Sequence, residues 1–194
     1  MTNLLYVCRW NIDRSPVAEQ ITRRKTGVEL NVSSAGLSDY HSYPCMGMSD
    51  EMRKTLKKLE YLPERHYNRR ITNELLRSQD IILCMQKSHV NGVLQKEPDL
   101  RGKVHTLPEY AGLPDQEIYS PSDLIREIPA FSIFSHMPYN VRGFIYRAFG
   151  HTDPRDYEGV IKVHMDTVKE IELYVDKAIE RMIKEGLIPK PILK

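Results

Sequence analysis

Short, uninterrupted apolar runs are the feature that most limits how this chain can fold. LLYVC at residues 4–8 is one, and DIILCM at residues 80–85 is apolar after its first residue. A run with no alternation of polar and apolar residues is typical of a strand that is buried on both faces, as in a parallel sheet. NVSSAG at residues 31–36 and KVHTL at residues 103–107 are predicted as two further strands.

Helical patterns fill the spaces between these strands. We expect helices at Pro16–Lys25 with Gly27 as the stop, after Ser49 as an N-cap, near residues 88–95, and from Tyr157 to Glu185. The last helix has an apolar stripe of Val160, Val163, Val168, Ile171, Val175, Ile179 and Met182. Strands separated by helices imply right-handed crossovers. The prediction is one doubly wound α/β domain over residues 1–194, a four-stranded parallel sheet flanked by helices on both faces.

Composition narrows the classes of protein. The 194 residues suit one domain, and the net charge of +2 gives no long-range field for nucleic acid or a membrane surface. The apolar runs are far shorter than the ~18 residues of a membrane span. Three cysteines indicate reduced thiols rather than a disulfide framework, and the histidines lack metal-ligand spacing. We therefore expect a cytoplasmic protein with no metal or other cofactor.

The segment YVCRWNIDRSP, from Tyr6 to Pro16, lies where the first strand gives way to the first helix. In parallel sheets this is where ligands bind, and a helix N-terminus attracts anions. Amides of the intervening loop could surround a phosphate, and Arg14 could add a bidentate contact. The positive electrostatic field of a helix N-terminus also stabilises a cysteine thiolate, so Cys8 is a candidate nucleophile. Ser15 is a candidate hydrogen-bond donor to its sulfur. A cysteine and an arginine at this spacing are common by chance, so a buried structural Cys8 is the alternative.

Four segments in order carry a family resemblance. LLYVCRWNIDRSPVAEQ resembles the loop V-C-x-G-N-x-C-R-S-P-x-A-E of the low-molecular-weight protein tyrosine phosphatases. SSAGLSDY at 33–40, HYNRRITNELLRSQDIILCMQKSH at 66–89, and Asp153 with Pro154 resemble later motifs of that family. The resemblance implies a phosphotyrosine protein phosphatase I-like fold with a segment inserted at about 115–150. That segment is interpreted as a lid, a dimer contact or a helical pair packed on the core, in a monomer or weak homodimer.

The resemblance also implies roles for individual residues. Cys8 attacks phosphorus, Arg14 holds the phosphoryl oxygens, and Asp153 protonates the leaving group, with Asp156 as the alternative acid. The phosphate-binding loop comprises Arg9, Trp10, Asn11, Ile12, Asp13, Arg14 and Ser15, and the residues that support it are Asn11, Ser15, Ser34 and His66.

Two departures from the family loop affect the site. Trp10 replaces a glycine, and it joins Tyr40 and Tyr157 as a candidate aromatic rim for the substrate. Asp13 replaces the second cysteine, so its carboxylate is expected either to turn away from a bound phosphate or to pair with a base such as Arg9.

The predicted function is a phosphatase that forms a phosphocysteine intermediate, with protein phosphotyrosine as its foremost substrate. Its partner is then a phosphorylated protein or a small phosphate monoester, and small aryl phosphates, phosphoarginine and sugar phosphates stay open as substrates. One alternative is a thiol enzyme like the arsenate reductases, which relay electrons through two further cysteines, for which Cys45 and Cys84 are the candidates. The other is a module that binds phosphate or a phosphoprotein without turnover.

Overall fold

The computed structural model describes residues 1–27, 30–38, 47–113, 116–119 and 154–190, with only the backbone described at 154–159. Asp153, Tyr40, Cys45 and nearly all of the segment predicted as an insertion lie outside these ranges. The boundaries of the single domain and of its insertion therefore stay predictions.

The centre of the fold is the predicted four-stranded parallel sheet. Its strands are β1 (Thr2–Cys8), β2 (Leu30–Gly36), β3 (Ile81–Cys84) and β4 (Val104–Thr106), in the order β2-β1-β3-β4. β1 lies between two neighbours, and its four central side chains are fully buried, as the apolar run predicts. The sequence prediction of the sheet is confirmed.

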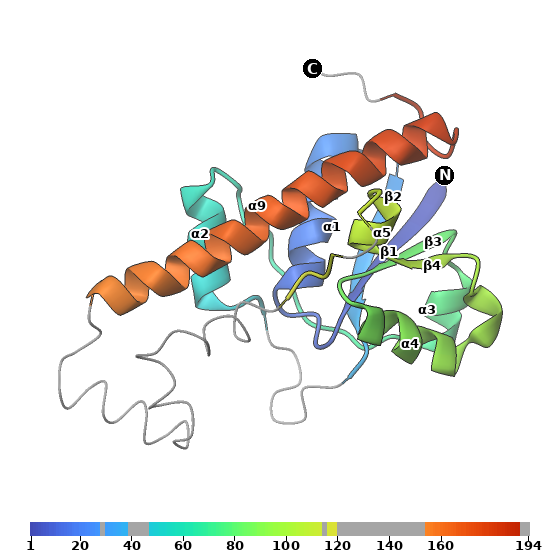
Figure 1. The fold of residues 1–194 in the computed structure, drawn as a ribbon, viewed down its shortest axis with the longest axis horizontal. Coiled ribbons are helices and arrows are strands. Elements are labelled where there is room, and N and C mark those ends of the chain that lie inside the picture. The colour runs from blue at the N-terminus through green and yellow to red at the C-terminus, as the bar shows by residue number, and fades with distance from the viewer. Residues whose placement is uncertain (28–29, 39–46, 114–115, 120–153, 191–194) are drawn as a thin grey trace.

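Helices cover both faces of the sheet (Figure 1). One face carries α1 (Arg14–Thr26), α2 (Asp50–Lys58) and the long α9 (Pro154–Lys184), which crosses α1 and α2. The other face carries α3 (Asn73–Arg77), α4 (Lys87–Lys96) and a 3-10 turn, η1 (Pro98–Leu100). The short helix α5 (Leu107–Tyr110) follows β4 and packs against α9. This is the doubly wound α/β arrangement that was predicted.

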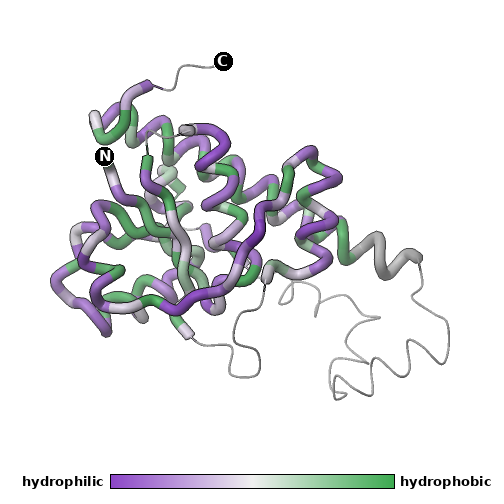
Figure 2. Tube along the Cα trace, turned by 180° about the vertical axis from the view of Figure 1, so that it is seen from behind, coloured by the Kyte–Doolittle hydropathy of each residue, from purple (hydrophilic) through white to green (hydrophobic). Residues whose placement is uncertain are grey.

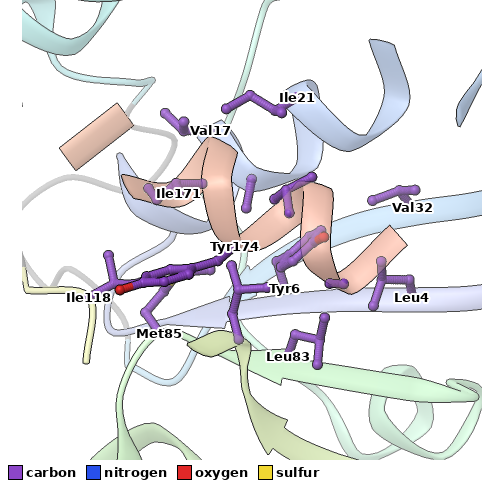
Figure 3. Close-up of a cluster of buried hydrophobic side chains, with 14 of the residues drawn as sticks. Leu4, Tyr6, Val17, Ile21, Val32, Leu83, Met85, Ile118, Ile171 and Tyr174 are labelled. Carbon is purple, nitrogen blue, oxygen red and sulfur yellow. The ribbon is translucent and has the colours of Figure 1, made fainter. Parts of the chain in front are cut away.

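Alternation along β1 divides the core into two clusters, because successive side chains of a strand point to opposite faces. Leu4, Tyr6 and Cys8 belong to the cluster under α1 and α9, whereas Leu5 and Val7 belong to the cluster under α4. Figure 3 shows the first cluster, in which side chains of α1, α9 and the sheet come together. Labelled there are Leu4, Tyr6, Val17, Ile21, Val32, Leu83, Met85, Ile118, Ile171 and Tyr174.

The end of α1 and the start of α2 are each fixed by a hydrogen bond, and α9 is held by its apolar stripe. α1 ends at Gly27, which has a φ of 62° and whose N–H donates to the carbonyl of Arg23 at 2.9 Å. Ser49 caps α2 as predicted, since its Oγ accepts from the N–H of Met52 at 3.2 Å. Within the predicted apolar stripe of α9, every residue except Val163 is buried.

The start of α9 differs from the prediction. The helix begins at Pro154, three residues before the expected Tyr157, so Asp156 lies in its first turn. Asp156 is thus inside the helix and is not its N-cap. Among the described helices, none is both long enough and apolar enough to cross a membrane.

Candidate active site

Cys8 is the last residue of β1, and its sulfur accepts two hydrogen bonds from the loop that follows. The N–H of Asn11 lies 3.2 Å from Sγ, and the Oγ of Ser15 lies 3.0 Å from it. Ser15 lies in the first turn of α1, which begins at Arg14. A sulfur that accepts hydrogen bonds beside a helix N-terminus is the kind of environment in which reactive cysteines occur. Cys8 is 3 % exposed, so its side chain is almost completely buried.

Asn11 is the residue on which the predicted supporting residues converge. It has a φ of 56°, in the left-handed region that Asn tolerates better than most residues. Its side-chain N–H₂ donates to Ser34 Oγ at 2.7 Å and to Ser15 Oγ at 3.1 Å. Its backbone carbonyl lies 2.7 Å from Nε2 of His66, which therefore carries the proton. The structure thus brings together the four residues expected to support the loop.

Two further contacts of this network were not predicted. The N–H of Arg69 donates to Asn11 Oδ1 at 3.0 Å, and Ser34 Oγ donates to Glu19 Oε2 at 2.5 Å. Glu19 in turn pairs with Arg23 on the same helix at 2.6 Å. Because each polar atom of the buried Asn11 side chain has a partner, the network fixes one conformation of the loop.

Gly36, at the end of β2, lets the loop lie against the sheet. A Cβ atom built on Gly36 would come within 2.8 Å of the carbonyl carbon of Trp10 and 3.0 Å of the N atom of Asn11. The next residues bind the loop from the same side, since Leu37 N–H donates to the Cys8 carbonyl and Ser38 N–H to that of Arg9. Any side chain at position 36 would therefore displace the loop backbone.

Arg14 is 6 % exposed and is held beside the loop by residues from two other segments. Its Nη1 donates to Gln86 Oε1 at 3.0 Å and to the carbonyl of Ile118 at 2.8 Å. Ile118 is itself fixed, because its N–H donates to the carbonyl of Met85. Within the described part of the chain these bonds use one nitrogen of the guanidinium, which leaves Nη2 and Nε to contact an anion.

Asp13 does not pair with Arg9, so that alternative was wrong. Its Oδ1 accepts from the backbone N–H of Ser49, at the start of α2, at 3.0 Å. Burial raises the pKa of Asp13, while hydrogen bonding from Ser49 and the nearby His164 oppose the rise. Arg9 instead stacks on Trp10, with the guanidinium carbon 4.9 Å from the ring centroid. The Asp13 carboxylate is thus turned toward the start of α2, which agrees with the other expectation, that it turns away from a bound phosphate.

His89, in the first turn of α4, is a buried neighbour of the site that the sequence did not single out. Burial together with the charges of Arg14 and Arg9 lowers the pKa of His89 to about 3. The ring is therefore neutral at physiological pH, and it adds no cation beside the two arginines.

The second described cysteine lies away from this chemistry. Cys84 is fully buried in the core cluster under α4, on the face of the sheet opposite Cys8, and burial raises its pKa. An inert, buried thiol gives no support to an electron relay. Among the described residues, no group of three or more His, Cys, Asp or Glu is arranged to hold a metal ion.

The remaining predicted residues cannot be placed. Asp153 and Tyr40 lie outside the described residues, and the side chains of Asp156 and Tyr157 are not described. The assignment of the general acid therefore stays a prediction, and so do the places of Tyr40 and Tyr157 in the aromatic rim. Ile12 lies in the loop and is partly exposed.

A parallel α/β sheet with a thiol at the carboxyl end of an inner strand, beside a helix N-terminus and a fixed arginine, is an arrangement suited to a protein that uses a thiol next to an anion site. A family model described as low molecular weight phosphotyrosine protein phosphatase matches residues 3–136, and the chain belongs to this family. The sequence-based assignment is confirmed. The protein is accordingly a phosphatase, an enzyme of the hydrolase class.

Individual relatives agree with this assignment. The chain is 36% identical over 102 residues to the low molecular weight protein-tyrosine-phosphatase Wzb of Escherichia coli K12, covering 53% of this chain and 67% of the relative. It is 30% identical over 116 residues to the protein-arginine-phosphatase of Bacillus subtilis, covering 56% and 71%. The YwlE arginine phosphatase structure from Geobacillus stearothermophilus superimposes with a TM-score of 0.70 over 96% of both chains at 20% identity, which establishes the fold.

Proposed function

We propose that the protein hydrolyses phosphate monoesters through a phosphocysteine on Cys8, and that phosphotyrosine in proteins is its main substrate. The observation that carries the proposal is the environment of the Cys8 sulfur, with donors from Asn11 and Ser15 at 3.2 and 3.0 Å. A buried sulfur held by two donors beside a fixed arginine suits attack on a bound phosphoryl group.

The proposed reaction has two steps. The Cys8 thiolate attacks phosphorus, an S–P bond forms, and the P–O bond to the leaving group breaks. The leaving oxygen takes a proton from Asp153, or from Asp156 in the alternative assignment. A water molecule then attacks phosphorus and gives its proton to the same carboxylate. The S–P bond breaks, so inorganic phosphate leaves and the thiolate is restored.

Arg14 contributes electrostatic stabilisation in both steps. Its contacts with Gln86 and Ile118 set the plane of the guanidinium before a substrate arrives. Nη2 and Nε can then contact two phosphoryl oxygens without a cost of ordering the side chain. A lysine at this position would present a single mobile charge instead.

The choice of phosphotyrosine is supported by relatives named as tyrosine phosphatases and by the aromatic Trp10 in the loop. One relative is named as an arginine phosphatase, so phosphoarginine is the competing substrate. The partner that we propose is a phosphorylated protein in the cytoplasm, where thiols stay reduced.

Phosphate release from matched peptides that carry phosphotyrosine or phosphoarginine, alongside an aryl phosphate, tests the proposal. Wild-type protein should release phosphate fastest from the phosphotyrosine peptide, and Cys8→Ser should lower the rate by about a thousandfold or more. Faster release from phosphoarginine would overturn the substrate assignment. Binding without release would favour the non-catalytic module, and arsenate-dependent thiol oxidation would favour the reductase.

A further inference from the structure

A chain of hydrogen bonds runs from α1 across the end of β2 to the sulfur of Cys8. Glu19 Oε2 accepts from Ser34 Oγ at 2.5 Å, and Ser34 Oγ lies 2.7 Å from the side-chain nitrogen of Asn11. The same nitrogen lies 3.1 Å from Ser15 Oγ, which in turn lies 3.0 Å from Cys8 Sγ. Every member of this chain after Glu19 is buried. The carboxylate is therefore joined to the sulfur by side chains that are shielded from water.

The backbone N–H of Arg69 fixes the orientation of the Asn11 amide at the centre of this chain. A backbone N–H can only donate, so the Asn11 atom that faces it at 3.0 Å is the carbonyl oxygen Oδ1. Arg69 belongs to the connection between α2 and α3, which Figure 2 shows as largely hydrophilic. Its carbonyl accepts from the N–H of Gly36, which holds this connection against the end of β2. The backbone of a distant segment thus directs the N–H₂ group of Asn11 toward the two serines.

The orientation of the Asn11 amide decides which way each serine proton points. An amide N–H₂ group only donates, so Ser34 Oγ and Ser15 Oγ both accept from it, and each keeps its own proton for another partner. The Ser34 proton goes to Glu19, since a carboxylate only accepts. The Ser15 proton is left for Cys8 Sγ. One set of proton positions therefore satisfies every donor and acceptor of the chain.

Glu19 opposes the reverse arrangement of these protons. If the Asn11 amide turned over, its Oδ1 would face both serines, and both hydroxyls would donate to it. The Ser15 proton would then leave the sulfur. A carboxylate beside Ser34 disfavours this arrangement, because a hydroxyl that donates to the amide leaves the carboxylate without its proton. The Glu19 side chain is only 13 % exposed, and an ion pair with Arg23 at 2.6 Å holds it in place.

We propose that Glu19 is a positioning residue for the phosphatase reaction, which takes the Ser34 proton and thereby keeps the Ser15 hydroxyl directed at the sulfur. The proposal rests on the proposed function for its effect on turnover, whereas its effect on the sulfur can be measured without a substrate. Glu19 acts through the network and not on the sulfur itself. The expected effect is moderate, because the backbone N–H that faces Asn11 Oδ1 stays in place when Glu19 is replaced.

The test is the rate at which iodoacetamide alkylates Cys8, followed by mass spectrometry of the peptide that contains it. Glu19→Gln has the same shape but can donate as well as accept, so alkylation at about pH 7 should slow by roughly threefold. At about pH 10 the two rates should be equal, because the thiol is then ionised in both proteins. The kcat/KM for an aryl phosphate should fall by a similar factor at about pH 7. The matched control is Glu64→Gln, which removes the carboxylate 3.5 Å from Arg23 and should change neither rate.

A double-mutant cycle shows whether Glu19 acts through the serine. In the Ser15→Ala background the further change Glu19→Gln should leave the alkylation rate unchanged, because no serine proton remains to be directed. Equal slowing in both backgrounds would overturn the proposal, and so would slowing that persists at high pH, since either result indicates a general disturbance of the loop. A Glu19→Gln rate equal to that of Glu64→Gln would also overturn it. If the alkylation results hold but wild-type protein releases no phosphate from an aryl phosphate, the proposed function fails instead.

Discussion

The side-chain amide of Asn11 donates to Ser34 Oγ at 2.7 Å and thereby ties the left-handed turn of the phosphate loop to β2. This one bond joins two segments that are separated by a whole helical crossover. Both partners are buried, so neither can exchange the bond for one to water.

Replacement of Asn11 tests how much this network stabilises the loop. Asn11→Ala removes its side-chain hydrogen bonds and puts a poorer residue at a φ of 56°, so the free energy of unfolding should fall by about 2 kcal/mol or more. Urea denaturation measures the loss. Asn11→Gly restores the backbone freedom but none of the side-chain hydrogen bonds, so it should recover only a minor part of the lost free energy of unfolding. Full recovery in Asn11→Gly would show that the dihedral angle alone accounts for the effect.

Ser15 is predicted to act through the Cys8 sulfur. Ser15→Ala removes the donor that lies 3.0 Å from Sγ, which should destabilise the thiolate and slow alkylation by iodoacetamide about tenfold near neutral pH. Hydrolysis of an aryl phosphate should fall by a similar factor. The control is Ser88→Ala, an exposed serine in α4, which should change neither rate. An unchanged alkylation rate in Ser15→Ala would show that this bond does not influence the sulfur.

Gly36 is predicted to be indispensable for the shape of the loop. In Gly36→Ala the new methyl would meet the carbonyl carbon of Trp10 at 2.8 Å, so the loop must shift and phosphatase activity should fall by at least about a hundredfold. Gly102→Ala is the matched control, because its Cβ would have no atom within 4 Å. Steady-state kinetics with an aryl phosphate, together with circular dichroism, separate loss of activity from loss of fold. Near-normal activity in Gly36→Ala would contradict the close packing described for the loop.

Asp13 is predicted to give stability a pH dependence. Burial raises the pKa of its carboxyl in the folded state, so the folded protein binds this proton more tightly than the unfolded chain. The contribution of Asp13 to the free energy of unfolding is therefore present at low pH. It is lost as pH rises from about 4 through the raised pKa of the folded state. Asp13→Asn keeps an acceptor for Ser49 without the titration, so its stability relative to wild type should increase over that range. Urea midpoints across the range test this, with the exposed Asp99→Asn as the control.

The four parallel strands and the place of Cys8 could be predicted because both depend on local patterns. Uninterrupted apolar runs specify buried parallel strands, and the carboxyl end of such a strand is where a loop meets a helix. The very short helices α3 and α5 could not be predicted in this way, since one turn has no apolar periodicity to detect.

Contacts between distant segments explain why the partners of Arg14 and Asp13 could not be predicted from the sequence. Gln86 and Ile118 hold Arg14 from sequence separations of 72 and 104 residues, and Asp13 meets Ser49 across 36 residues. No local pattern encodes such pairs, because they depend on how crossovers place one loop over another. For Gly36 a signal existed, since a glycine that ends a strand beside a phosphate loop indicates close approach of two backbones.

Acid-quenched mass spectrometry of the enzyme during turnover of an aryl phosphate tests the central claim most directly. The account predicts one added phosphoryl group on the peptide that contains Cys8, present during turnover and absent in Cys8→Ser. Turnover by the wild type with no modification of this peptide, or with the phosphoryl group on another residue, would contradict it.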